Sequence, residues 1–254
     1  MQRVRGISGS TLKMIAMVSM VTDHTAAVLL GLFLMRRGIY SVWNTSPEYI
    51  NELLSYGSVG VLYVAYQIMR MVIGRLAFPI YCFLLVEGFQ RTGNRLKYMS
   101  RLFLFCLVSE IPFDLAFYGQ AFEWNHCNVF FTLFISFVMM LLWEELEGRC
   151  PVILVRWLGQ FFIFAAAAGL GEWIGCDYGA KGIIAVGLLY LFRKNRASQI
   201  AAGCVAFLWE VTAPLAFIPV AFYNGKKGWN LKYVFYIFYP AHLLLLHFLY
   251  LKFL

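Results

Sequence analysis

Charged residues are scarce in this sequence, and their scarcity argues against a water-soluble fold. Asp, Glu, Lys and Arg make up 13% of the 254 residues, whereas about 25% is usual for soluble domains. Hydrophobic residues make up 61%. Because a membrane crossing needs about 20 apolar residues, the sequence predicts an all-α, polytopic transmembrane bundle of about nine to ten helices. We expect residues 1–254 to form one domain in the lipid bilayer.

Metal-site and redox motifs are also missing. The six cysteines are scattered without a CxxC pair, so we predict neither a zinc site nor a catalytic dithiol, and no metal. Cys127 and Cys176 both fall in connections predicted to lie outside the cell, so a disulfide and two free thiols remain alternatives. No internal repeat is visible, which gives no support to the inverted repeats of many transporters.

Basic residues are present, with a net charge of +8, and they separate apolar runs. The clusters are Arg91, Arg95, Lys97 and Arg101; Arg149 and Arg156; Arg193, Lys194 and Arg196; and Lys226, Lys227 and Lys232. Such clusters mark cytoplasmic loops of membrane proteins. Because membrane spans interrupt them, we expect no binding to nucleic acid.

This orientation makes two predictions about the path of the chain. Residues 200–223 must enter and return, with a break near Thr212 and Pro214, because one crossing would carry Lys226 outside. At the front, if Arg3 and Arg5 are cytoplasmic, only one crossing can lie between residues 36–56 and Arg91. Either 57–74 is a separate helix at the surface or within the bundle, or the amino terminus lies outside; we favour the separate helix.

The first apolar run carries ionisable residues where hydrocarbon makes them expensive, which favours a functional position. Lys13 and His24 are eleven residues apart, so on a helix they point in nearly the same direction about 16 Å apart. Histidine suits proton transfer near neutral pH, and Asp23 is a candidate to orient its ring. The alternative interpretation is a polar pair that closes a helix contact.

Other ionisable residues lie within later apolar runs: Glu87, Glu110, Asp114, Glu210, His242 and His247. Glu110 and Asp114 have the i,i+4 spacing that puts both carboxylates on one helix face. Two such groups in a dry site require a proton or a nearby cation, for which Arg75 and Arg101 are candidates. The connection NHCNVFFT contains Asn128, a candidate helix cap. The connection GCDYGAKG contains Asp177 and Tyr178, which we expect at the end of the bundle that faces outside the cell.

Several segments resemble the TraX family of membrane proteins. They are LKMIAMVSMVTDH (12–24), GRLAFPIYCFLLVEGF (74–89), SEIPFDLAF (109–117), NVFFT (128–132), DYGAKG (177–182) and FYPAHLLLL (238–246). The resemblance implies N-acetylation of a protein, known best for the amino terminus of conjugative pilin, with acetyl-CoA as donor. Lys13 and His24 also resemble the Arg/Lys-x10-His motif of the wider membrane acyltransferase superfamily, which implies a catalytic role for His24.

The resemblance, taken with the ionisable residues inside the apolar runs, implies a membrane-embedded acetyltransferase of the bacterial cytoplasmic membrane. We expect His24, oriented by Asp23, to act as general base or acetyl carrier, and Lys13, Arg75, Arg95 and Arg101 to hold acetyl-CoA. The expected acceptor is an amine or hydroxyl of a pilin-like protein or a surface glycan. Substrate binding or proton relay is expected at Glu87, Glu110, Asp114, Asn128, Asp177, Tyr178 and His242.

Two other functions remain open at this point. A proton-coupled transporter or flippase would titrate Asp23, Glu110 and Asp114 during alternating access. An assembly chaperone for pilin-like proteins would need no chemistry and would tolerate neutralisation of these charges.

Overall fold

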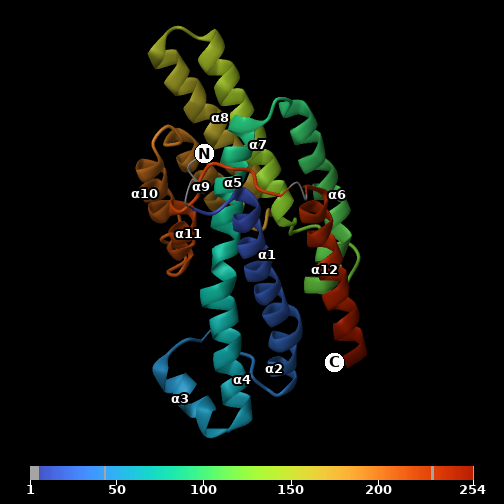
Figure 1. The fold of residues 1–254 in the computed structure, drawn as a ribbon. Coiled ribbons are helices and arrows are strands. Elements are labelled where there is room, and N and C mark those ends of the chain that lie inside the picture. Colours follow the sequence, from blue (N-terminus) through green and yellow to red (C-terminus); the bar gives the residue numbers. More distant parts are fainter. Residues whose placement is uncertain (1–5, 43, 230–231, 254) are drawn as a thin grey trace.

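The computed structural model describes residues 6–42, 44–229 and 232–253, so Arg3 and Arg5 lie outside the described residues. These ranges form helices and no β-strand, which confirms the predicted all-α class (Figure 1). The α-helices are α1 (Gly9–Thr25), α2 (Leu32–Arg36), α3 (Pro47–Ser55), α4 (Ser58–Gln67), α5 (Ala77–Arg91), α6 (Arg95–Tyr118), α7 (Val129–Arg149), α8 (Ile153–Trp173), α9 (Gly179–Leu191), α10 (Arg196–Ala206), α11 (Phe217–Ala221) and α12 (Lys232–Phe253).

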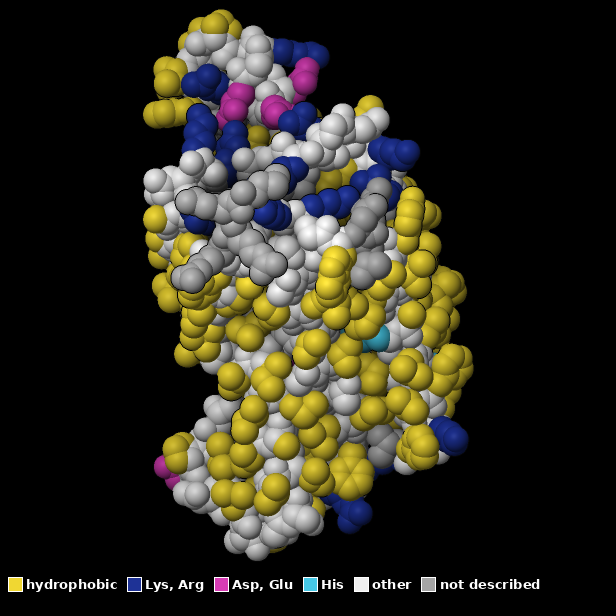
Figure 2. All heavy atoms as spheres, in the orientation of Figure 1, with side chains coloured by type: hydrophobic (Ala, Val, Ile, Leu, Met, Phe, Trp, Pro, Cys, Tyr) yellow, Lys and Arg dark blue, Asp and Glu magenta, His cyan; other side chains and the backbone are white. Residues whose placement is uncertain are grey.

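In the part of the chain that the structure describes, five helical stretches are long and apolar enough to cross a bilayer, which makes this a multi-pass membrane protein. They are Gly9–Arg36, Ser58–Arg91, Val129–Arg149, Ile153–Trp173 and Tyr233–Phe253. Hydrophobic side chains cover the middle of the molecule, and most of the Lys and Arg side chains in view gather toward one end (Figure 2). We call this the basic end; it carries the connection between α5 and α6 and that between α7 and α8.

Residues 58–91 form one continuous helix of 34 residues. Only one crossing therefore lies between residues 36–56 and Arg91, which agrees with an amino terminus at the cytoplasmic side. A π-helical turn, Ile68–Ile73, and a 3-10 turn, Gly74–Leu76, join α4 to α5. The prediction of a separate helix over 57–74 is therefore wrong. Arg70 and Arg75 interrupt the apolar pattern without ending the helix, because Asp23 pairs with Arg70 and Glu210 with Arg75.

The predicted break in residues 200–223 is confirmed. Helix α10 ends at Ala206, a 3-10 turn covers Ala213–Ala216, and the short helix α11 follows. Just after α11, the backbone N–H of Ile7 donates to the carbonyl of Phe222 at 2.9 Å. The chain therefore returns to the end of the bundle at which α1 begins, as the positions of Lys226 and Lys227 required.

A glycine lets α1 approach the long helix closely at mid-length. The hydroxyl of Ser19 donates to the carbonyls of Ile73 and Gly74, at 2.6 and 3.1 Å. A Cβ atom at position 74 would overlap the carboxylate of Asp23. Gly74 thus leaves the space in which Asp23, next to His24 in sequence, fits against the neighbouring helix.

We predict that Gly74→Ala destabilises the protein by about 1–3 kcal/mol, the usual cost of overpacking a close contact. The measurement is thermal unfolding in detergent. Gly169→Ala is the matched control, because Gly169 lies within α8 and a Cβ there meets nothing within 4 Å. A Gly74→Ala protein as stable as the wild type would show that this helix contact is not tight.

Candidate functional site: two cavities that meet at a histidine

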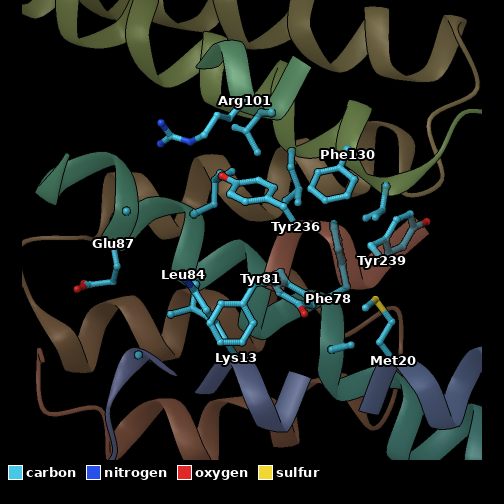
Figure 3. A pocket seen from close by; sticks show the side chains of 18 of the residues that line it. Lys13, Met20, Phe78, Tyr81, Leu84, Glu87, Arg101, Phe130, Tyr236 and Tyr239 are labelled. Atoms are coloured by element: carbon cyan, nitrogen blue, oxygen red, sulfur yellow. The ribbon is translucent and has the colours of Figure 1, made fainter. Parts of the chain in front are cut away.

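A cavity of about 530 Å³ reaches from the basic end into the bundle; we call it the inner cavity. Helices α1, α5, α6, α7 and α12 supply most of its walls, and Lys13, Arg91, Arg101 and Lys227 supply its cationic groups. Figure 3 shows Glu87, Leu84, Tyr81 and Phe78 in a row along it. Each lies three residues from the next along α5, so neighbouring members of the row adjoin on the helix surface.

A second cavity, of about 550 Å³, lies toward the opposite end; we call it the outer cavity. The connections between α6 and α7 and between α8 and α9 contribute to its walls, for example through His126 and Gly175. Its lining contains aromatic rings, including that of Trp209, and both acidic and basic side chains. The charged residues are Asp23, Glu172, Asp177, Glu210, Arg70, Arg75 and Lys181.

Four residues line both cavities: Asp23, His24, Asp177 and Tyr178. The two cavities therefore meet at the first-helix histidine that the sequence singled out. The other predicted residue of the same helix face, Lys13, lines the inner cavity. A group that enters from the basic end and a group that enters from the opposite end can thus both reach His24.

His24 is held by a second histidine from the last long helix. Its Nδ1 lies 2.7 Å from Nε2 of His242, and Nδ1 of His242 lies 2.8 Å from the carbonyl oxygen of Phe238. A carbonyl only accepts, so the proton of neutral His242 sits on Nδ1 and its Nε2 accepts from His24. This assignment, made from the hydrogen-bond network, leaves Nε2 of His24 with a free lone pair.

Asp23 pairs with Arg70 at 2.5 Å, and not with the ring of His24. Both side chains are mostly buried, with exposed fractions of 15% and 13%. Breaking such a pair would leave an uncompensated buried charge. The structure therefore gives Asp23 the task of joining α1 to the long helix beside His24, while His242 orients the ring.

Asp177 and Tyr178 follow the glycine turn between α8 and α9, and both reach the junction of the cavities. Asp177 is exposed and lines both cavities. Desolvation by the surrounding bundle raises its pKa to about 7, and the negative charge of Asp23 adds to this effect. Asp177 therefore changes charge near neutral pH. The ring of Tyr178 stacks on Phe78 with centroids 3.5 Å apart.

Glu110, Asp114 and Asn128 lie near the outer cavity but do not line it. Asn128 caps α7, as predicted, and donates from its side chain to Glu110 and to the carbonyl of Cys106. Asp114 accepts from the backbone N–H of Glu123 at 2.9 Å. Among the described residues no Lys or Arg pairs with Glu110 or Asp114. Backbone N–H groups of the α6–α7 connection donate to one oxygen of each carboxylate, and the other oxygen of Asp114 is buried without a hydrogen-bond partner.

Three predicted positions differ from their expected places. Arg75 lies in the outer cavity, where it pairs with Glu210 at 3.0 Å. Arg95 pairs with Glu144 at 2.7 Å and lines neither cavity. Glu87, at which we expected substrate binding or proton relay, lies near the basic end, within 3.0 Å of both Arg91 and Arg196.

Several residues of the site were not selected from the sequence. Arg70 carried the same signal as Asp23, a charge within an apolar run, and Arg91 and Lys227 belonged to recognised basic clusters. Trp209 carried no signal, since a tryptophan in an apolar segment is ordinary.

Cys127 and Cys176 are free thiols in the structure, although their backbones pair directly with one another.

The fold and this site define a class: a multi-pass helical membrane protein whose buried histidine lies where two cavities meet. A sequence model described as TraX protein matches residues 8–250, and the chain belongs to the TraX family. It is also 28% identical, over 97% of each chain, to a probable fimbrial assembly protein FimC (serogroup H1) of Dichelobacter nodosus. No solved structure matches the chain.

Proposed function

We propose that this protein is a membrane-embedded acetyltransferase that transfers an acetyl group from cytoplasmic acetyl-CoA to an amine or hydroxyl of a protein or surface glycan. The observation that carries the proposal is the position of His24, with a free ring nitrogen, at the junction of two cavities that reach opposite ends of the bundle. Membership of the TraX family supports it. The bacterial cytoplasmic membrane fits the arrangement, with the basic end inside.

The lining of the inner cavity supports the proposal that acetyl-CoA is the donor. Phosphate groups are best held by Lys and Arg, and Lys13, Arg91, Arg101 and Lys227 all line this cavity. Beyond them the walls are mainly apolar, as suits a long uncharged arm; Tyr81, Leu84 and Leu85 are examples. When bound, acetyl-CoA supplies an acetyl group activated as a thioester.

The task of His24 in this proposal is to hold a proton. Its Nε2 accepts the proton that an acceptor amine or hydroxyl loses as the new bond to the acetyl carbon forms and the bond to sulfur breaks. His242 stabilises the resulting imidazolium, because its Nε2 already accepts from Nδ1 of His24. The proton then leaves with the thiol of CoA, so the histidine returns to its starting state.

The acceptor is proposed to enter through the outer cavity. The mixture of Asp177, Glu172 and aromatic rings there suits a polar group such as an amine or a sugar. The name of the Dichelobacter nodosus relative, a fimbrial assembly protein, supports a surface protein as the acceptor. A proton-coupled transporter fits less well, because Glu110 and Asp114 line neither cavity.

We predict that His24→Ala lowers acetyl transfer by about 10²–10⁴, the usual contribution of a positioned general base. Mass spectrometry of surface proteins and glycans from cells with wild-type and variant protein would measure acetylated products. His247→Ala, a buried histidine elsewhere on α12, is the matched control and should retain transfer. Full acetylation by the His24→Ala protein, present at normal amounts in the membrane, would refute the proposal.

We also predict that Lys13→Met and Arg101→Met each weaken acetyl-CoA binding about five- to tenfold, since each removes a charge-assisted contact to phosphate. Affinity can be read from thermal stabilisation of purified protein by ligand. Binding of S-acetylpantetheine, which lacks the nucleotide phosphates, should change little. Arg95→Met is the control outside the cavity; if it weakened acetyl-CoA binding as much as the other two, the assignment of the phosphate site would be wrong.

A further inference from the structure

Aromatic rings close the deep end of the inner cavity, beside His24. Phe78 is 4% exposed and Tyr239 is 3% exposed, and the ring centroid of Tyr239 lies 6.0 Å from that of His24. Figure 3 shows Phe78, Met20 and Tyr239 together at one end of the cavity, with Glu87 toward the other. An acyl group brought to His24 from the basic end would therefore lie against these side chains.

The ring of Phe78 cannot move aside easily. It stacks on Tyr178 at an interplanar angle of 7° and meets Phe207 edge-on at 5.9 Å. A Cβ atom at Gly182 would lie 2.9 Å from the tip of the same ring, so the backbone of α9 fits directly against it. Because Tyr178 lines both cavities, the stacked pair also backs the boundary between them.

We propose that Phe78 sets the length of the acyl group that this protein accepts, admitting acetyl and rejecting chains of four carbons or more. The inference rests on the proposed function and adds to it the residue that selects the acyl donor by its chain length. A longer chain has to displace a ring held on three sides, and overpacking of this kind is unfavourable even for apolar groups. Without that ring, each added methylene would instead strengthen binding.

The test compares the affinity of purified protein for acetyl-CoA, butyryl-CoA and hexanoyl-CoA, read as thermal stabilisation by each ligand. We expect the wild type to bind butyryl-CoA at least about tenfold more weakly than acetyl-CoA. Phe78→Ala should remove this difference or reverse it. Phe78→Leu, which keeps most of the buried apolar volume, should give an intermediate ratio and serves if the alanine variant does not fold.

Leu84→Ala is the matched control, because Leu84 lines the same cavity nearer to the basic end; it should leave the butyryl-to-acetyl ratio unchanged. Equal binding of acetyl-CoA and butyryl-CoA by the wild type would overturn the inference while leaving the proposed function standing, as would an unchanged ratio in both Phe78 variants. A wild-type protein that binds no acyl-CoA at all would instead overturn the proposed function and this inference with it.

Discussion

The ion pair between Asp23 and Arg70 is the contact on which the rest of the arrangement depends. Hydrocarbon penalises unpaired charge severely, so the two helices that carry these residues must stay together. Gly74 allows the close approach, and Ser19 strengthens it with hydrogen bonds to the backbone of the long helix. The same contact fixes the position of the next residue, His24, which His242 then orients.

Charge also explains which parts of the fold could be predicted from the sequence. The return of residues 200–223 followed from the positions of Lys226 and Lys227, because clusters of positive charge encode the orientation of the spans. The continuity of 58–91 did not follow. Arg70 and Arg75 look like interruptions in the local pattern, and their partners, Asp23 and Glu210, are far away in the sequence.

The same distinction holds for the candidate site. Helical spacing was enough to place Lys13 and His24 on the same face of one helix, and both line the inner cavity. The pairing of His24 with His242, 218 residues later, depends on how the last helix packs, which no local pattern encodes. Glu110 and Asp114 show the converse: their spacing placed them on one face, but their partners are groups of a connection.

In this arrangement one histidine serves two cavities with access from opposite ends. It can be tested directly with wild-type protein reconstituted into sealed vesicles, with acetyl-CoA supplied only at the basic end and two acceptor probes, a peptide with a free amino terminus and glucosamine, present on both sides. We expect acetylated product in the compartment opposite the donor. Product found only on the donor side would contradict it.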